Sequence, residues 1–397
     1  MNKMNYDKYL NKKVKDIPPS GIRKFFDIVA ERKDAISLGV GEPDFDTQWV
    51  CRDAAIKSIQ KGYTQYTSNA GLLKLRELIA KYYSERYSVD YDPKTDIIVT
   101  VGASEGIDLS LRAIVCPGDD ILVPAPSYVS YSPCVTLAGG NAVSVECYQK
   151  DDFRVTVESL EKAITPNTKA LLLPYPNNPT GAILEEKELI KIAKFVIEHD
   201  LLVISDEIYS ELTYTQKGHI SIASIEGMKE RCIVLNGFSK AFAMTGWRLG
   251  YLLAPSEICK TIYKIHQYAI MCAPTPSQYA GVAGLESGFK DNFAEIAKMR
   301  DQYDMRRRFL VKSLNDMGLE CFEPKGAFYV FPCVKSLNMT GDEFANLLFQ
   351  EENLAVVPGS AFGDSGKYYI RISYAYSIKK IEEALIRIKA FVERHRV

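Results

Sequence analysis

Residues 239–248 read Ser-Lys-Ala-Phe-Ala-Met-Thr-Gly-Trp-Arg and follow an apolar run, Cys232–Leu235, that is typical of a buried strand. The stretch places Lys240 just beyond that strand and Arg248 eight residues later. At the mouth of a parallel sheet, a lysine amine can form a Schiff base with an aldehyde, and an arginine can bind a phosphate with two N–H groups. Pyridoxal 5′-phosphate carries both groups. A single lysine is by default a solvated surface charge, so this interpretation depends on the rest of the chain.

Composition limits the class of protein. The chain has 397 residues, 47% of them hydrophobic, and a formal net charge of −1. This length predicts two or three domains of roughly 100–200 residues each, and the apolar fraction supports a large core. The nearly neutral charge gives no reason to expect nucleic acid or a membrane surface as a partner. We interpret the run Arg306–Arg308 as a solvated helix face, because acidic residues surround it.

Cysteine and histidine usage points to a protein of a reducing compartment that has no metal site. The nine cysteines occur singly and form no Cys-x-x-Cys pair, which favours reduced thiols in a cytoplasmic protein over a disulfide framework. With four scattered histidines, we expect no zinc or other metal site. No apolar stretch approaches the ~20 residues of a membrane span. The polar, lysine-rich segment Met1–Lys15 has no apolar core of a secretory signal.

Between about residues 50 and 290, short apolar runs alternate with longer amphipathic ones. Most of the apolar runs are rich in Val, Ile and Leu without alternation, as in strands that are covered on both faces. The predicted strands are Ile97–Val101, Ile121–Pro124, Ala142–Val145, Ala170–Pro174, Leu202–Asp206, Cys232–Asn236 and Tyr251–Ala254. This alternation predicts an α/β sheet with helical crossovers.

Two details of the helices between these strands can be predicted. The segment Glu185–His199 is expected to form a helix with one apolar side, made of Leu189, Ile190, Ile192, Ala193 and Val196. Ser256 is expected to be the N-cap of the helix after the last strand.

From about Asp291 the pattern changes. A long charged helix is predicted to about Met317, followed by short strands at Ala327–Phe331, Ala355–Val357 and Tyr369–Ser373 and by a last helix over Lys379–Glu393. This order is typical of a smaller α+β domain. We therefore predict three parts, which are an N-terminal arm with part of the small domain (1–45), a large domain (46–290) and a small C-terminal domain (291–397).

Open α/β sheets bind ligands at the carboxyl ends of their strands, so the residues at these ends are candidates for a site. The first predicted strand leads into Gly102, Ala103 and Ser104, where helical N–H groups and a hydroxyl would face an anion, although a plain strand–helix turn has the same signature. The fourth leads into Asn177 and Asn178. A turn explains the prolines around these two residues and leaves their amides unexplained.

The fifth predicted strand ends at Asp206, with Tyr209 three residues on. A carboxylate here can cap a helix, or it can meet a protonated heterocyclic nitrogen. Together, the strand ends offer an anion-binding helix start, an amide, a carboxylate with a phenol, and an amine with an arginine. Because these groups complement one ligand, their combination indicates a pyridoxal-phosphate site.

The motifs Pro176–Gly181, Ser205–Tyr209 and Ser239–Gly250 resemble those of the class I aminotransferases of fold type I. The likeness covers nearly the whole chain, since the segment Ser37–Phe45 resembles the family's N-terminal substrate loop and three further segments resemble its small domain, namely Lys325–Tyr329, Val357–Gly363 and Arg371–Ala375. The resemblance implies a large domain with a seven-stranded, mostly parallel sheet, a smaller α+β domain, pyridoxal 5′-phosphate as cofactor, and a homodimer with active sites at the interface. The nearest subgroup contains prokaryotic aspartate, aromatic and N-acyl-diaminopimelate aminotransferases.

The resemblance also implies a role for each matching residue. Lys240 matches the Schiff-base lysine, Asp206 the carboxylate on the pyridine nitrogen, Tyr209 and Asn178 the groups on the ring oxygen, and Tyr128 the stacked aromatic residue. The residues that match the phosphate cup are Gly102, Ala103, Ser104, Ser239 and Arg248, with Tyr66 from the other subunit. Arg371 matches the clamp on the substrate α-carboxylate, with Asn178 and the Gly41 backbone beside it. Gly237 departs from the pattern, because many relatives have serine there.

The function that this resemblance implies is transfer of the amino group of an α-amino acid, aromatic and/or aspartate, to 2-oxoglutarate by a ping-pong mechanism, with Lys240 carrying the proton. N-acyl-diaminopimelate transamination and a β-lyase acting on cysteine conjugates are the alternatives. A regulator built on this fold would need a DNA-binding module before the substrate loop, and a nicotinamide dehydrogenase would need Gly-x-Gly-x-x-Gly after an early strand. Arg23 either meets a second substrate carboxylate or lies on the arm, and we favour the arm.

Overall fold

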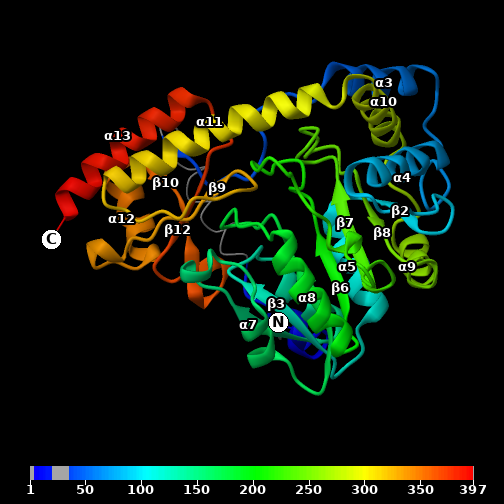
Figure 1. The fold of residues 1–397 in the computed structure, drawn as a ribbon, viewed down its shortest axis with the longest axis horizontal. Helices are drawn as coiled ribbons and strands as arrows, with labels where there is room; N and C mark the ends of the chain where they lie inside the picture. The colour runs from blue at the N-terminus through cyan, green and yellow to red at the C-terminus, as the bar shows by residue number, and fades with distance from the viewer. Residues whose placement is uncertain (1–3, 20–34, 397) are drawn as a thin grey trace.

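The computed structural model describes residues 4–19 and 35–396. Its main sheet has seven strands in the order β2-β8-β7-β6-β5-β3-β4 (Figure 1). Strand β8 is antiparallel to both of its neighbours, and every other neighbouring pair is parallel. The strands are β2 (Ile97–Thr100), β3 (Asp120–Ala125), β4 (Asn141–Glu146), β5 (Thr168–Leu173), β6 (Leu202–Asp206), β7 (Cys232–Gly237) and β8 (Gly250–Leu253). All seven predicted strands are confirmed, with ends that differ by at most two residues.

Helices cover both faces of this sheet, which explains its continuous apolar runs. Successive strand residues such as Val203 and Ile204 belong to separate hydrophobic clusters on opposite faces. One face is covered by α4 (Leu73–Tyr87), α7 (Val157–Ala163), α8 (Glu186–Glu198) and α10 (Thr275–Asp291), and the other by α5 (Gly102–Ile114), α6 (Tyr131–Ala138) and α9 (Ser256–Ala269). Helix α3 (Trp49–Gln60) packs against α10.

The predicted helix over 185–199 is confirmed as α8, but two details of the helix predictions are wrong. Ile190 is 52% exposed, because it lies about 100° around the helix from the buried Leu189. Ser256 is the first residue of α9 rather than its N-cap. Pro255, whose backbone is outside the helical region, occupies the cap and starts the helix one residue earlier than predicted.

The C-terminal region has its own sheet and its own hydrophobic cluster. Three antiparallel strands lie in the order β11 (Val357–Pro358), β12 (Ile370–Ser373) and β9 (Tyr329–Val330), and β1 (Ile36–Ser37) pairs in parallel with β10 (Leu354–Ala355). The helices are α11 (Ala294–Asp316), α12 (Gly341–Glu352) and α13 (Ile378–His395). Figure 1 shows α11 running between these elements and α3 with α10. The division of the chain at residues 45 and 290 stays a prediction.

The prediction of a solvated arginine run is wrong for two of its three residues. Arg306 donates to both carboxylate oxygens of Asp44, at 2.8 and 2.9 Å. Arg307 is buried and bonds Asp304 and Glu323. Only Arg308 is exposed to solvent, because α11 packs against the segments that contain Asp44 and Glu323.

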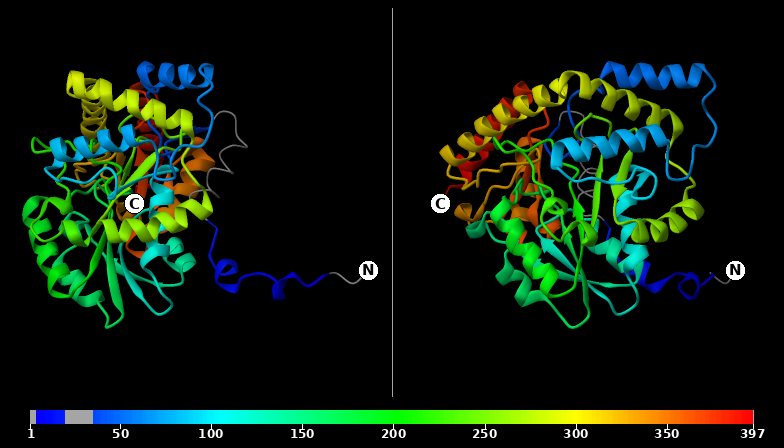
Figure 2. Two further views of the ribbon diagram at one scale, coloured as in Figure 1. Left: turned by 90° about the vertical axis from the view of Figure 1, so that its right-hand side faces the viewer. Right: turned by 45° about the vertical axis from the view of Figure 1, so that its right-hand side comes forward.

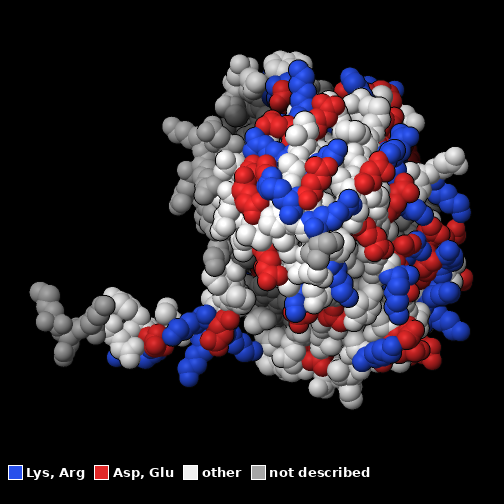
Figure 3. Space-filling model, turned by 90° about the vertical axis from the view of Figure 1, so that its left-hand side faces the viewer, with Lys and Arg blue, Asp and Glu red and all other residues white. Residues whose placement is uncertain are grey.

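On the face of the molecule drawn in Figure 3, charges of both signs are mixed, with lysines and arginines interspersed with acidic residues. Figure 2 shows the N-terminal segment that contains α1 (Lys12–Lys15) extending away from the body of the molecule. None of the described helices has the length and apolar content to cross a bilayer. All nine cysteines are free, and the described residues contain no metal-binding group of three or more His, Cys, Asp or Glu side chains.

Candidate active site

A cavity of about 800 Å³ lies where the carboxyl ends of β6 and β7 meet the start of α5 and the C-terminal sheet. Most of the residues predicted for the site line it, namely Gly41, Ala103, Ser104, Tyr128, Asn178, Asp206, Tyr209, Ser239, Lys240, Arg248 and Arg371. These residues come from segments up to 330 positions apart in the chain (371 minus 41). The fold therefore gathers the predicted groups around one space.

Lys240 follows β7 and points its amine into this cavity. Its Nζ donates a hydrogen bond to the Gly41 carbonyl oxygen at 2.7 Å. Burial, together with the positive charges of Arg371 and Arg248, lowers the pKa of the Lys240 amine from 10.5 to about 8, while Glu42 and Asp206 oppose the shift. An amine with this pKa is partly neutral near physiological pH and can act as a nucleophile.

Asp206 is the last residue of β6 and is 5% exposed. Tyr131 Oη donates to its Oδ2 at 2.9 Å, and the Ile208 backbone N–H donates to its Oδ1 at 3.1 Å. Burial raises the pKa of Asp206 to about 6, although both hydrogen bonds favour the anion. The result is a buried carboxylate, ionised at neutral pH, that can pair with a cationic nitrogen in the cavity. Sequence reasoning missed Tyr131, which stands only three positions after the predicted site residue Tyr128.

Arg371 and Tyr209 lie on the opposite wall, where the C-terminal sheet closes the cavity. Arg371 donates from Nη1 to Asn178 Oδ1 at 2.8 Å and from Nη2 to the Gly39 carbonyl oxygen at 2.5 Å. Its Nε is buried and has no hydrogen-bond partner among the described residues. The hydroxyls of Tyr209 and Tyr329 lie 2.9 Å apart. The Arg371 guanidinium suits a carboxylate ligand, and Tyr329, which ends the segment Lys325–Tyr329, is a wall residue that had no role of its own in the sequence prediction.

The start of α5 forms an anion-binding cup because two glycines allow a close approach of the backbone. A Cβ on Gly102 would lie 2.4 Å from Arg248 Nη2, and one on Gly250 would lie 2.6 Å from the Ala103 nitrogen. Gly102 has φ +72, a conformation that other residues rarely adopt. Gly102 therefore lies behind the cup, while Ala103, Ser104 and Arg248 face the cavity. Helical N–H groups and a guanidinium suit a phosphate.

The departure at Gly237 has a steric cause. A Cβ there would lie 2.9 Å from both the Gly250 Cα and the Leu249 carbonyl oxygen, so that serine does not fit. The hydroxyls available at the cup are those of Ser104 and Ser239. Asn177, in contrast to Asn178, has a structural task, since its Oδ1 accepts from the backbone N–H and the hydroxyl of Thr180.

One residue predicted for the site, Tyr66, lies away from the cavity. Tyr66 is 76% exposed and does not line it. Its segment is fixed to the start of α10, where Thr275 Oγ1 donates to the Gln65 carbonyl oxygen at 2.8 Å. Arg23 lies outside the described residues.

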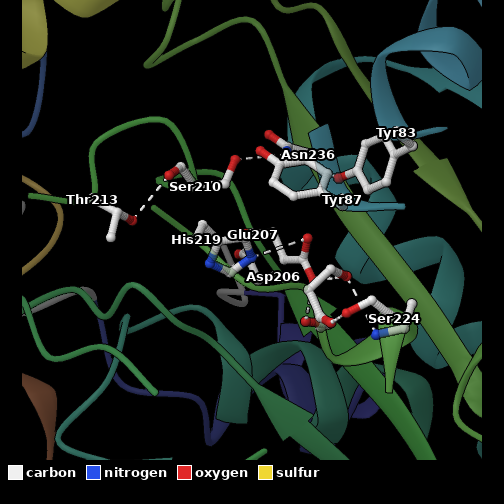
Figure 4. A network of polar contacts seen from close by, with 12 residues as sticks. Tyr83, Tyr87, Asp206, Glu207, Ser210, Thr213, His219, Ser224 and Asn236 are labelled. Carbon is white, nitrogen blue, oxygen red and sulfur yellow. Dashed lines mark hydrogen bonds and ion pairs between the residues drawn. The ribbon is translucent and has the colours of Figure 1, made fainter. Parts of the chain in front are cut away.

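A buried polar network supports the segment that carries Asp206 and Tyr209 (Figure 4). Asn236 on β7 donates from Nδ2 to Tyr83 Oη at 3.0 Å and to Ser210 Oγ at 3.1 Å. Figure 4 also shows His219 beside Glu207, with its Nε2 3.2 Å from a carboxylate oxygen.

Glu207 itself is fully buried. Its Oε1 accepts from the hydroxyls of Ser205 and Ser221 at 3.0 and 2.7 Å. Together with the bonds of Asn236, these contacts keep Asp206 and Tyr209 in one orientation.

The residues present fit pyridoxal 5′-phosphate. The cavity combines a nucleophilic amine at Lys240, a buried carboxylate at Asp206 for the pyridine nitrogen, and a cup at Ser104 and Arg248 for the phosphate. The Arg371 guanidinium, which lines the same cavity, suits a substrate carboxylate.

Comparison with known proteins agrees with this geometry. The model of the family "Aminotransferase class I and II" matches residues 33–388. The aspartate aminotransferase of Pyrococcus abyssi is 47% identical over 94% of this chain and 95% of that protein. The aromatic-amino-acid aminotransferase 2 of Thermococcus litoralis is 43% identical over 98% of this chain and 99% of that protein. The solved structure of aspartate aminotransferase from Thermus thermophilus with maleate has a TM-score of 0.91 at 34% identity, over 96% of this chain and 99% of that one. The chain therefore belongs to the class I and II aminotransferases, and it is a pyridoxal-phosphate-dependent transaminase of fold type I.

Proposed function

We propose that this enzyme transfers the amino group of an aromatic amino acid, of aspartate, or of both to 2-oxoglutarate by a ping-pong mechanism. The observation that carries the proposal is that Lys240 and Arg371 line one cavity, the first with its amine and the second with its guanidinium. The first suits attachment of the cofactor, and the second suits an α-carboxylate. The names of the two relatives, one an aspartate and the other an aromatic-amino-acid aminotransferase, support these two substrate classes.

Each end of the cofactor has a matching set of residues. We assign the phosphate to Arg248, Ser104 and Ser239 with the N-terminus of α5, and the pyridine nitrogen to Asp206. Asn178 and Tyr209 would hydrogen-bond the ring oxygen and Tyr128 would stack on the ring, since all three residues line the cavity. When bound, pyridoxal 5′-phosphate supplies an electron sink for the electron pair that Cα keeps after losing its proton.

Lys240 has two tasks in this scheme. It would attach the cofactor through its amine, and the same amine, when free, would be the base that takes the proton from Cα of the substrate and carries it. Its lowered pKa, about 8, suits a group that must give and take a proton near neutral pH. Asp206 favours a protonated ring nitrogen, because a buried carboxylate stabilises a neighbouring cation.

Arg371 orients the substrate. Its guanidinium carbon lies 4.4 Å from the Tyr329 ring centroid and 4.9 Å from that of Phe362, so the group is fixed between two aromatic rings. Two of its five N–H donors are used by Asn178 and Gly39, so three remain for other acceptors such as the α-carboxylate. This arrangement holds the Cα–H bond of any α-amino acid near Lys240.

We further propose a homodimer in a reducing compartment such as the cytoplasm. Large apolar side chains are exposed on α3 and near the end of α9, where Trp49 is 63%, Ile59 56% and Tyr268 87% exposed. A second copy covering this surface would bury them and would bring Tyr66 towards the phosphate cup of its partner. Nine free thiols support the reducing compartment. Sedimentation equilibrium tests the assembly, and a monomer at micromolar concentration would contradict it.

A steady-state screen of amino donors against 2-oxoglutarate tests the activity. We expect the highest kcat/KM for aromatic amino acids or aspartate, with glutamate formed in equal amount to the oxo acid. Higher activity with N-acyl-diaminopimelate would select that alternative. Release of pyruvate and ammonia from cystathionine without any oxo-acid acceptor would instead indicate a β-lyase.

A further inference from the structure

His266, on α9, is a titratable group that the mechanism above leaves unused. Its side chain is 0% exposed, and it lies between α9 and the first turn of α5, directly behind the phosphate cup. Nδ1 lies 2.8 Å from Glu105 Oε1, and Nε2 lies 2.9 Å from the Asn69 carbonyl oxygen. Both ring nitrogens therefore have an oxygen partner at hydrogen-bond distance.

The chemistry of these partners restricts the protonation state of the ring. A backbone carbonyl oxygen can only accept, so the Nε2 position must carry hydrogen. An ionised carboxylate also accepts only, and because the Val101 N–H donates to Glu105 Oε2 at 2.5 Å, Oε1 is the oxygen that faces Nδ1. An acceptor at both nitrogens requires a doubly protonated ring, the imidazolium.

The charge balance at the cup gives this cation a function. Glu105 lies in the first turn of α5, two residues beyond Ala103. Its carboxylate closes the strand–helix turn through Val101, but its negative charge disfavours a phosphate dianion nearby. A cation at His266 compensates that charge from the side away from the cavity.

We propose that His266 is a buried imidazolium that positions the phosphate cup by holding Glu105 and offsetting its charge. The proposal rests on the assignment of the phosphate to Ser104 and Arg248. His266 acts through Glu105 and does not touch the cofactor, so it is a positioning residue. Through the Asn69 carbonyl it also links the cup to the segment that carries Tyr66.

The protonation state can be measured without cofactor or substrate. Protein labelled with ¹⁵N in its four histidines is prepared as apoenzyme, and the His266 signals are identified by their absence in His266→Gln. At neutral pH we expect both His266 ring nitrogens to carry hydrogen. A ring nitrogen of His266 without hydrogen would overturn the proposal, because the histidine would then be neutral.

The positioning role is tested by cofactor affinity. In His266→Gln we expect the dissociation constant of pyridoxal 5′-phosphate to rise roughly ten-fold, with turnover at saturating cofactor within about two-fold of the parent. The control His199→Gln should change neither quantity. A folded His266→Gln enzyme with an unchanged dissociation constant would refute the role.

Glu105→Gln covers the case in which His266→Gln does not fold. The new amide oxygen can still accept from Val101, while the charge that requires an imidazolium is gone. We expect a neutral His266 ring in the ¹⁵N spectrum of this variant, and persistence of the doubly protonated ring would contradict the proposed pairing. If Arg248→Ala bound pyridoxal 5′-phosphate as tightly as the parent, the proposed assignment of the phosphate would be refuted. The protonation state of His266 would still stand, so the two failures are distinguishable.

Discussion

Both ends of the cavity hold a charge in a fixed position, but different parts of the chain hold it. At the nitrogen end, side chains define the site, since Asp206 is buried and accepts from Tyr131. At the phosphate end the backbone defines it, because Gly102 and Gly250 bring β8 and the start of α5 together. The first end is expected to control turnover and the second to control cofactor affinity.

Each end is also backed by a glutamate–histidine pair, and the two pairs differ. His266 has an acceptor at each ring nitrogen, Glu105 and Asn69. His219 Nε2 lies 3.2 Å from a carboxylate oxygen of Glu207 without hydrogen-bond geometry. Neither of these two atoms has a hydrogen-bond partner in the described part of the chain. The same two residue types therefore do not make the same hydrogen bonds, and the surrounding acceptors decide which bonds form.

Removal of Lys240 should have the largest effect, because this residue lies between the two ends and serves both steps. In Lys240→Ala we expect no visible absorbance of lysine-attached cofactor and a fall in turnover of at least ~10⁴-fold. Absorbance spectra and initial rates measure both. Lys260→Ala, which changes an exposed lysine of α9, should behave like the parent. Borohydride reduction followed by peptide mapping should find the tag at position 240, and a tag on another lysine would contradict the assignment.

Asp206→Asn isolates the nitrogen end. Loss of the buried charge should lower kcat by about 10²–10³-fold, while the dissociation constant of the cofactor changes far less, because the phosphate contacts remain. Initial rates and a cofactor titration give the two numbers. If the titration changed more than kcat, the proposed contrast between the ends would be wrong.

Arg371 lies outside both ends of the cavity, so the variant Arg371→Ala should keep its affinity for the cofactor. We expect kcat/KM to fall by roughly 10–150-fold, the equivalent of one charge-assisted hydrogen bond, and to fall alike for every amino acid, since all share the α-carboxylate. Rates with an aromatic and an acidic donor provide the test. A loss confined to dicarboxylic substrates would instead make Arg371 a reader of the side chain.

Arg248→Ala and Ser104→Ala compare two contacts within the phosphate end. The charge-assisted contact should be worth more, so we expect the cofactor dissociation constant to rise about 10–150-fold for Arg248→Ala and about 2–13-fold for Ser104→Ala. Titration of the apoenzyme followed by absorbance measures both. Equal dissociation constants would mean that the helix start, rather than the guanidinium, dominates the cup.

The smallest expected effect is the pH dependence of the rate of cofactor attachment. Because burial lowers the pKa of Lys240 to about 8, the neutral, attacking amine becomes dominant above this pH. The rate of cofactor attachment to the apoenzyme should therefore rise with pH around 8 and level off above it. The positive charge of Arg371 contributes to the lowered pKa, so Arg371→Ala should move the midpoint upwards. A rate that keeps rising without levelling off up to about pH 10.5, by stopped-flow absorbance, would show that the pKa of the amine is not lowered.

The pKa shift of Lys240 also affects stability, with a defined sign. The folded-state pKa, about 8, lies below the ordinary value of 10.5, so protonation opposes folding. The contribution of this group to the free energy of unfolding should therefore rise as the pH increases from about 8 to 10.5.

The sequence by itself determined the seven strands, because helices on both faces of the sheet demand long apolar runs that are visible in the chain. It also determined that Lys240, Asp206 and Asn178 follow strand ends, since strands and turns are local features. Whether a helical residue such as Ile190 faces the core, or a basic run such as Arg306–Arg308 faces solvent, depends on which elements pack beside it.

Only the tertiary structure decided the partners of these groups. Tyr131 meets Asp206 across 75 residues of chain, and His266 meets Glu105 across 161. No local pattern encodes such contacts, because they arise when the strands and helices pack. Burial, which lowers the pKa of Lys240 and raises that of Asp206, arises at the same stage, for it is the packed protein that removes water from both groups.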